Sequence, residues 1–267
     1  MILWNEIKLG KGVGVLELPF MGRQIHPTLI WDDETVVLVD TGFPGQLEEI
    51  RNAMDEAGIP LSKLSKVIIT HQDFDHIGGL QEILKASGRK IEVIAHKEEK
   101  PFIEGDKPLL KMKPERLAGM FEALPAEKRK EAEAKFLESL KSKVDKTVDD
   151  GEVLPYCGGI TVIFTPGHTP GHIGLYLNQY KTLITGDALN VVDGQLVGPN
   201  VEFTPDMDTA TKSLEKLTQY DVETSWRSLP GECEGAATGA DQGVVNYFGG
   251  THLQMRKPEL MPRMNKL

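Results

Sequence analysis

The sequence predicts an α/β domain in which a helical segment separates two runs of strands. Apolar and β-branched runs such as Val36-Val37-Leu38-Val39 alternate with helical patterns in the first half, as expected for strands buried in a sheet. Charged helical stripes fill residues 98–150, and strand-like runs resume at Ile160. With 267 residues, of which 40% are hydrophobic, the chain can bury the core of one such domain.

The elements of the first half follow from local patterns. Apolar runs predict strands at residues 13–18, 28–31, 35–39, 67–70 and 91–95. Apolar residues at helical spacing predict helices at residues 46–57 and 80–86, and Gly58 closes the first of them. A tight turn at residues 32–34 joins the second strand to the third.

Residues 98–150 differ in character from what precedes them. Apolar side chains form stripes among dense Lys and Glu, and Pro114 and Pro125 mark helix starts, with acids near the positive end of each helix dipole. The pattern predicts two or three amphipathic helices inserted between the halves of the domain. A solvated helical decoration is the alternative to a functional cap.

The second half of the chain returns to strands, and the tail after it shows neither the alternation of a strand nor the spacing of a helix. We expect strands at residues 160–164, 174–177, 181–185 and 195–197, a hairpin loop at 190–194 and a helix at 208–220. Beyond Thr224 the chain is rich in Gly, Ala and acids, and it then becomes basic with two prolines. Residues 1–224 are therefore predicted to form the domain, and residues 225–267 an atypical, irregular tail.

One loop concentrates side chains that bind metals. His71-Gln72-Asp73-Phe74-Asp75-His76 directly follows the apolar run at residues 67–70, and Gly78-Gly79 comes shortly after it. Neutral imidazole and ionised carboxylate are ligands for zinc, iron or manganese, and a loop leaving a strand can aim several of them inward. A solvated polar turn is the alternative, but two His and two Asp so closely spaced favour a metal site.

Two further strand ends carry the same kind of residue. His168 and His172 lie in Thr165-Pro166-Gly167-His168-Thr169-Pro170-Gly171-His172, after the run at residues 160–164, and Asp187 follows the run at residues 181–185. One edge of a sheet could collect all of these side chains. Three such strand ends in one chain predict a metal site.

These motifs, together with Asp40-Thr41-Gly42 after the strand at residues 35–39, resemble the metallo-β-lactamase-fold hydrolase superfamily from about Leu16 to about Thr224. The resemblance implies a four-layer αβ/βα sandwich that hydrolyses a small electrophile with a metal-bound hydroxide at a site of two zinc ions. Carried over by position, the first metal would be held by His71, Asp73 and His168. Asp75 and His76 would hold the second, and Asp187 would bridge them.

Two departures from the family pattern bear on the metal. The family loop is His-x-His-x-Asp-His, and here Asp73 stands at the second His. A carboxylate adds negative charge and a hard oxygen ligand, which raises the chance of iron or manganese and makes the bound water less acidic. The family also takes a last His from a His-Gly motif, where this chain reads Ser225-Trp226-Arg227-Ser228.

The missing His suggests a hypothesis about the gene. The four residues from Ser225 can be written TCA-TGG-CGG-AGT, and reading one base later gives His-Gly-Gly, so the tail is out of frame relative to its relatives if this codon choice is correct. Sequencing the source gene tests it. Without that His, the second metal lacks a ligand unless His252, Glu232 or Glu234 replaces it.

Other residues receive supporting roles from the same resemblance. Asp75 would steer the nucleophile and then pass a proton to the leaving group. Asp40 and His172 would orient ligands or the backbone around them. The insert would act as a cap, with Met112, Met120, Phe121 and Asn190 contributing to a substrate wall. Asn190 lies near the position where lactonase relatives often place a Tyr.

Composition and charge limit the partners. The net charge of −10, with lysines interleaved among acids, argues against nucleic acid, which needs clustered Lys and Arg. No apolar stretch approaches the length of a bilayer span, and residues 1–6 lack the order of a signal peptide. The two cysteines suggest no disulfide framework. We expect a cytoplasmic protein that acts on a small molecule, and a homodimer stays open.

Three functional hypotheses remain at this stage. The first is a metallo-hydrolase acting on a lactone, ester, thioester or β-lactam. The second is an iron-dependent oxidoreductase of the same fold, suggested by Asp73. The third is a metal-impaired relative, suggested by the altered C-terminus. Metal analysis and a substrate screen would separate them.

Overall fold

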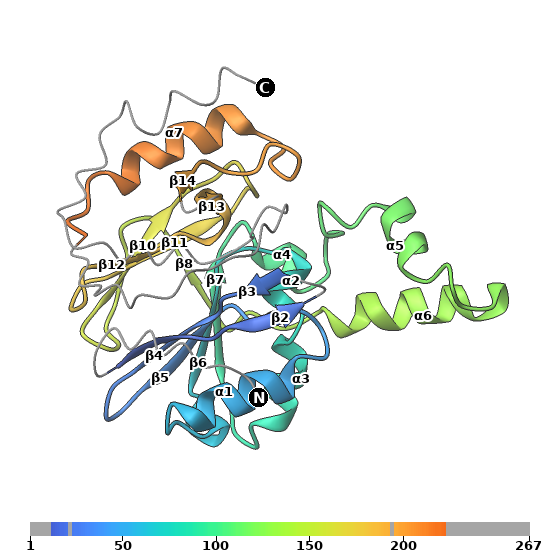
Figure 1. The fold of residues 1–267 in the computed structure, drawn as a ribbon, viewed down its shortest axis with the longest axis horizontal. Coiled ribbons are helices and arrows are strands. Elements are labelled where there is room, and N and C mark those ends of the chain that lie inside the picture. Colours follow the sequence, from blue (N-terminus) through green and yellow to red (C-terminus); the bar gives the residue numbers. More distant parts are fainter. Residues whose placement is uncertain (1–11, 21–22, 193–194, 223–267) are drawn as a thin grey trace.

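The computed structural model describes residues 12–20, 23–192 and 195–222, and there the chain forms four layers (Figure 1). A six-stranded sheet has the order β1-β4-β5-β6-β7-β8. Its strands are β1 (Val13–Val15), β4 (Thr28–Trp31), β5 (Val36–Val39), β6 (Lys66–Ile69), β7 (Glu92–His96) and β8 (Lys146–Val148). β1, β4 and β5 pair antiparallel, and β5 to β8 pair parallel. The parallel strands therefore end at one edge, where the loop after β6 begins.

The second sheet is antiparallel, with the order β12-β11-β10-β9. Its strands are β9 (Val153–Leu154), β10 (Ile160–Phe164), β11 (Ile173–Leu177) and β12 (Thr182–Ile184). Two separate hairpins accompany the sheets: β2 (Leu18–Phe20) with β3 (Arg23–Ile25), and β13 (Asn190–Val192) with β14 (Gln195–Val197). The hairpin loop expected at residues 190–194 is therefore largely a strand, because Asn190–Val192 pairs with β14.

Side-chain alternation explains how the layers pack. Val37 and Val39 of β5 enter the apolar cluster between the two sheets, where they join residues such as Leu175 of β11. Leu38, which points to the opposite face, packs with Ile50 beneath the helices on that side. A third cluster fixes the helix after β14 against the second sheet. The order helix, sheet, sheet, helix confirms the predicted α/β sandwich.

The covering helices lie close to where their apolar spacing predicts them. They are α1 (Leu47–Glu56) and α3 (Leu80–Ala86) outside the first sheet and α7 (Met207–Leu217) outside the second. Short helical turns are α2 (Phe74–Ile77), α4 (Lys100–Ile103), η1 (Leu61–Lys63) and η2 (Gly186–Ala188). Asp206 caps α7 by accepting a hydrogen bond from the Thr209 N–H at 3.0 Å. No helix in the described ranges is long and apolar enough to cross a bilayer.

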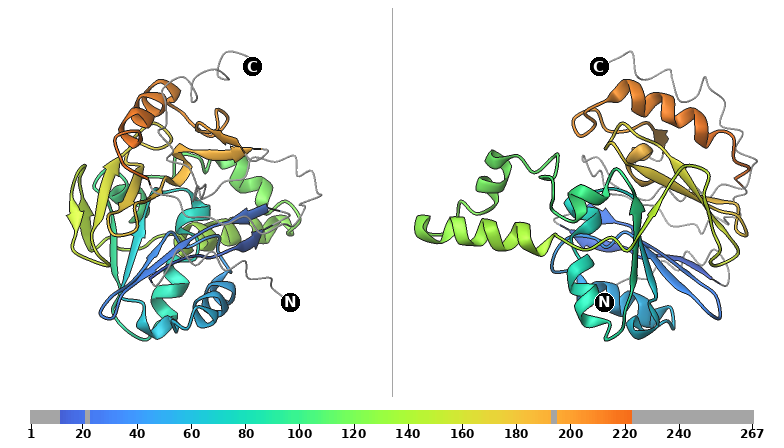
Figure 2. Two further views of the ribbon diagram at one scale, coloured as in Figure 1. Left: turned by 60° about the vertical axis from the view of Figure 1, so that its left-hand side comes forward. Right: turned by 180° about the vertical axis from the view of Figure 1, so that it is seen from behind.

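Helices α5 (Pro114–Met120) and α6 (Ala126–Ser139) project from the body of the molecule (Figures 1 and 2). They belong to the connection between β7 and β8, which pair parallel and so need a crossover. β8 falls inside the range expected for the insert, so the inserted helices end before Lys146. Residues 225–267, predicted to be an irregular tail, lie outside the described residues.

Candidate metal centre

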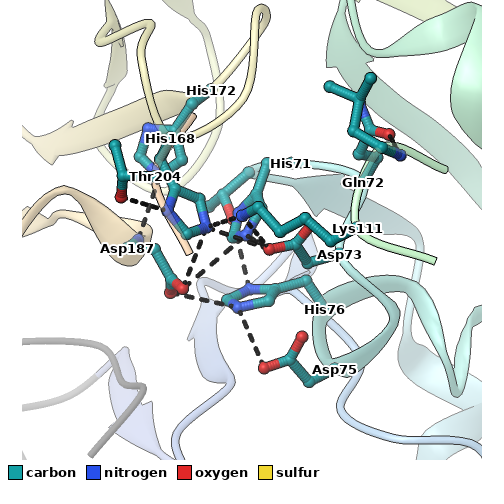
Figure 3. A network of polar contacts seen from close by, with 12 residues as sticks. His71, Gln72, Asp73, Asp75, His76, Lys111, His168, His172, Asp187 and Thr204 are labelled. Atoms are coloured by element: carbon teal, nitrogen blue, oxygen red, sulfur yellow. Dashed lines mark hydrogen bonds and ion pairs between the residues drawn. The ribbon is translucent and has the colours of Figure 1, made fainter. Parts of the chain in front are cut away.

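The ligand-bearing segments meet where the two sheets meet. His71 and Asp73 follow β6, His168 lies between β10 and β11, and Asp187 lies in η2 after β12. The Ile173 N–H of β11 donates to the Thr70 carbonyl at 3.1 Å, which ties the start of β11 to the end of β6. Residues nearly 120 positions apart therefore face one another, as Figure 3 shows.

Four of the predicted ligands form one cluster. Their candidate ligand atoms, on His71, Asp73, His168 and Asp187, all lie within 4.8 Å of one another. Asp73 Oδ2 is 3.3 Å from His71 Nε2 and 3.0 Å from His168 Nε2, and Asp187 Oδ2 is 3.2 Å from His168 Nε2 and 4.0 Å from His71 Nε2. Two ligands about 2.1 Å from one tetrahedral ion are roughly 3.4 Å apart. The four separations therefore suit one metal ion.

The hydrogen bonding of these atoms also fits a metal. Among the described residues, His71 Nε2, Asp75 Oδ2 and Asp187 Oδ1 are buried and make no hydrogen bond. Leaving buried polar atoms unpaired is costly, and native structures contain few of them without an explanation. Here the same atoms have the chemistry of metal ligands. Nitrogen and oxygen donors of this mixture suit zinc, iron or manganese.

Asp75 and His76 lie within α2, beside the cluster, and the ring centroids of His71 and His76 are 3.9 Å apart. His76 Nε2 is 3.2 Å from Asp187 Oδ1 and 3.9 Å from Asp75 Oδ2. This places the residues predicted for a second metal together, and the two carboxylate oxygens of Asp187 contact His168 and His76 (Figure 3). The position of the missing last His, at Ser225, and its suggested replacements His252, Glu232 and Glu234 lie outside the described residues.

Burial and neighbouring charges shift the pKa values of the residues in this centre in opposite directions. Burial lowers the pKa of His71 to about 4, and burial together with the neighbouring imidazoles holds the pKa of His172 well below its usual value. Burial also lowers the pKa of His76, but the carboxylates of Asp40, Asp187 and Asp75 outweigh it and bring the pKa well above the usual range. Burial raises the pKa of Asp75 to about 6.

Asp40 anchors the loop that follows β6 and carries His71 to His76. The residue has φ of 60°, a left-handed conformation that non-glycine residues seldom adopt. Its carboxylate accepts hydrogen bonds from the Thr70 N–H and the Thr70 hydroxyl, both at 2.8 Å, and lies 2.9 Å from His76 Nδ1. A proton on His76 Nδ1 leaves Nε2 facing Asp187, which is how a carboxylate orients a ligating imidazole.

His172 supports the second side of the centre. The Asp187 N–H donates to His172 Nε2 at 3.0 Å, so this nitrogen is an acceptor and does not face a metal. His172 Nδ1 lies 2.8 Å from the Thr165 hydroxyl. The residue therefore fixes the backbone of Asp187.

Two buried residues that sequence reasoning missed connect the loops. Glu99 is fully buried and accepts hydrogen bonds from the Gln72 N–H at 2.8 Å and the Gly171 N–H at 2.7 Å. Gln72 Oε1 in turn accepts from the Leu110 N–H at 2.9 Å. Glu99 thus bridges the loop of His71 to that of His168, and Gln72 ties the insert to both. No local motif marks either residue.

A cavity that opens to solvent lies beside Asp73 and Asp75. Phe74, Leu109, Met112 and Phe203 give it apolar walls, and Lys111 and Arg116 add positive charge.

The substrate wall predicted from sequence is only partly present here. Met112 lines the cavity, but Met120 is 43% exposed and Phe121 packs edge-on against Phe136 of α6 with ring centroids 5.8 Å apart. Phe121, directly after α5, is thus used for contact with α6, and neither Met120 nor Phe121 lines the cavity. Asn190 is buried, and its side-chain amide donates to the Gly198 carbonyl at 3.2 Å. It stabilises the β13–β14 hairpin and does not line the cavity.

Comparisons with known proteins agree with this arrangement. The model of the metallo-beta-lactamase superfamily matches residues 21–225. The probable metallo-hydrolase YflN of Bacillus subtilis is 31% identical over 204 residues, which are 72% of this chain and 74% of that one. The hydroxyacylglutathione hydrolase GloC of Haemophilus influenzae is 28% identical over 176 residues, 64% of this chain and 70% of that one.

Solved structures show the same fold. A metallo-beta-lactamase family protein of Thermus thermophilus superposes with a TM-score of 0.57 at 25% identity, over 79% of this chain and 70% of that one. The subclass B3 metallo-beta-lactamase BJP-1 of Bradyrhizobium japonicum superposes with a TM-score of 0.55 at 19% identity, over 83% and 76% of the two chains. The residues matched by the family model include every candidate ligand from His71 to Asp187.

Proposed function

The chain belongs to the metallo-beta-lactamase superfamily, and we propose that it is a metal-dependent hydrolase of small carbonyl electrophiles. The cluster of His71, Asp73, His168 and Asp187 carries this proposal, together with the buried atoms His71 Nε2 and Asp187 Oδ1, which make no hydrogen bond. Asp75, His76 and Asp187 are the residues proposed for a second ion. Zinc is the proposed metal, and the carboxylate of Asp73 keeps iron or manganese as alternatives.

The ions, when bound, would polarise a substrate carbonyl and lower the pKa of a coordinated water. The protein supplies the rest of the chemistry. Asp40 and His172 hold His76 and the Asp187 backbone in place through the hydrogen bonds described above. Asp75 lines the cavity and has a buried carboxylate oxygen that makes no hydrogen bond, so it is the proposed residue for steering the nucleophile and passing a proton to the leaving group.

The cavity supports a small, partly apolar substrate. It opens to solvent beside Asp73 and Asp75, and Leu109, Met112 and Phe203 give it apolar walls. Lactones, esters, thioesters and β-lactams are the proposed substrate classes, because each has a carbonyl that hydroxide can attack. Thioesters are included because one relative is named a hydroxyacylglutathione hydrolase. The net charge of −10 supports a small molecule over a nucleic acid as the substrate.

A screen combined with metal analysis tests the proposal. The full chain is loaded separately with zinc, manganese and iron, the bound metal is counted by mass spectrometry, and a lactone, an ester, a thioester, a β-lactam and a phosphodiester are offered to each form. We expect metal-dependent hydrolysis of at least one carbonyl substrate that is lost in Asp75→Asn. Hydrolysis that persists in the chelated protein, or metal binding with no hydrolysis of any member, would refute the proposal.

The iron-dependent oxidoreductase is retained as a second candidate because Asp73 is a hard oxygen ligand within the cluster. Iron that co-purifies with the chain and gives a coloured optical band would favour it. A chain that binds about one zinc ion or none would instead point to a metal-impaired relative lacking the last His.

A further inference from the structure

A lysine from the insert reaches into the centre of the ligand cluster. Lys111 Nζ lies 2.5 Å from Asp73 Oδ2 and 2.5 Å from His168 Nε2 (Figure 3). Its side chain is 13% exposed, far less than a surface lysine. Both contacted atoms are candidate ligands of the first metal.

We propose that Lys111 is a resident cation of the first metal position, which competes with the metal ion for Asp73 and His168. The inference rests on the proposed metal centre. His168 Nδ1 lies 3.2 Å from the Thr204 hydroxyl, and a proton on that nitrogen leaves one lone pair, on Nε2. That lone pair can accept from the Lys111 ammonium or coordinate an ion, and it cannot do both.

Charge gives a second reason for competition. The ammonium and a divalent ion repel each other strongly when both lie within a few ångströms of Asp73 in a buried site. The ion pair between Lys111 and Asp73 must therefore break before the ion can use this carboxylate fully. The free energy of metal binding is reduced by whatever the ion pair contributes.

The backbone keeps Lys111 at the site. The Leu110 N–H donates to Gln72 Oε1, and the Gln72 N–H donates to Glu99 Oε2. This chain of hydrogen bonds anchors the insert next to the ligand loop, so the ammonium stays nearby even when it is displaced. The cavity beside Asp75, which Lys111 already lines, offers the space it would move into. Metal loading is thereby linked to a movement of residues 107–113.

Metal affinity of the full chain tests the competition. The metal-free protein is titrated with Zn²⁺ and with Co²⁺ against a chromophoric chelator at fixed pH, for wild type, Lys111→Met, Lys111→Arg and Lys113→Met. Lys111→Met should bind the first ion at least about tenfold more tightly, because the competing cation is gone. Lys111→Arg keeps a positive charge and should stay within about threefold of wild type. Lys113 is exposed in the same segment, so Lys113→Met is the matched control and should equal wild type.

Hydrogen exchange of the same samples tests the movement. Adding Zn²⁺ should increase exchange in residues 107–113 of wild type and of Lys113→Met, and should leave this segment of Lys111→Met unchanged. Equal or weaker metal binding by Lys111→Met overturns the inference while the proposed function stands. If Lys111→Met binds metal and wild type does not, the inference is supported, and the proposed metal-dependent function of the wild-type chain is refuted. A failure of every variant to bind overturns both.

Discussion

Replacing Glu99 by Gln tests whether the two ligand loops depend on one buried carboxylate. Both backbone N–H groups, of Gln72 and Gly171, point at separate oxygens of this side chain. Gln keeps the shape but turns one oxygen into an NH₂ group. A donor then faces a donor, and one backbone N–H is left unpaired in a fully buried place.

The size of the effect follows from these two bonds. A hydrogen bond to a charged group contributes about 1.5–3 kcal/mol, and leaving a buried donor unpaired costs about 1–3 kcal/mol. Burial raises the pKa of Glu99, which means that burying its charge is unfavourable. Removing the charge therefore offsets part of the stability lost with the hydrogen bonds. We expect Glu99→Gln to lower the free energy of unfolding by about 2–3 kcal/mol. In a domain of this size that corresponds to a Tm lower by roughly 4–12 °C.

Thermal and urea unfolding of the metal-free protein measures this directly, and the chelator titration measures the metal affinity. Because Glu99 sets the distance between the loops of His71 and His168, affinity should fall by about tenfold as well. Glu98 is the adjacent exposed acid, and Glu98→Gln is the control that should match wild type. A Glu99→Gln protein with the wild-type Tm and metal affinity would show that the loops are held by other contacts.

Three further outcomes follow from the same geometry. Asp75→Asn should lower kcat by about 10²–10⁴-fold on any substrate found in the screen, because it removes the proposed acid–base group. The Tm should not fall, because the buried oxygen of Asp75 makes no hydrogen bond. A large drop in Tm would instead show that Asp75 has a structural role. Gly171→Ala should cost about 1–3 kcal/mol in urea unfolding, since the new Cβ would lie 2.7 Å from the Glu99 backbone nitrogen and 2.8 Å from its Cγ; an unchanged midpoint would argue against the tight approach. Burial raises the pKa of the Cys157 thiol from 9.0 to about 12, so it should resist iodoacetamide at pH 8 until urea is added, as peptide mass mapping would show. Because the folded pKa is the higher one, this thiol favours the fold below pH 9, and its contribution is lost as the pH rises toward 12.

Local pattern was sufficient for most of the fold. Runs such as Ile160–Phe164 and Thr28–Trp31 are strands because they are β-branched, apolar and bounded by turn residues, and α3 has the bounds that its apolar spacing predicts. Short elements were missed: the β2–β3 hairpin and β9 have too few residues to show a period. The strand β8 was hidden inside the charged insert, because its pairing with β7 depends on a partner about 50 residues away.

Local sequence also predicts some residues of the site and not others. The ligand cluster was predictable because each motif follows a strand and His and Asp are rare in such density. Met120 and Phe121 do not line the cavity, which the sequence could not predict because a helical stripe shows which face is apolar and does not show what covers it. Glu99 and Lys111 each act at a single position, separated by 27 and 38 residues from their partners Gln72 and Asp73, so nothing in their neighbourhood distinguishes them from other acids and lysines.

Asp73 and Lys111 have to be considered as a pair. On its own, the carboxylate of Asp73 adds negative charge to the first metal position and should strengthen binding of hard cations relative to an imidazole. Lys111 brings a positive charge to the same oxygen and opposes that gain. The metal affinity of this chain therefore depends on the balance between the two, and neither residue alone predicts it. A double-mutant cycle of Asp73→His and Lys111→Met should show strong coupling in metal affinity, because the lysine loses its ion-pair partner once the imidazole is in place.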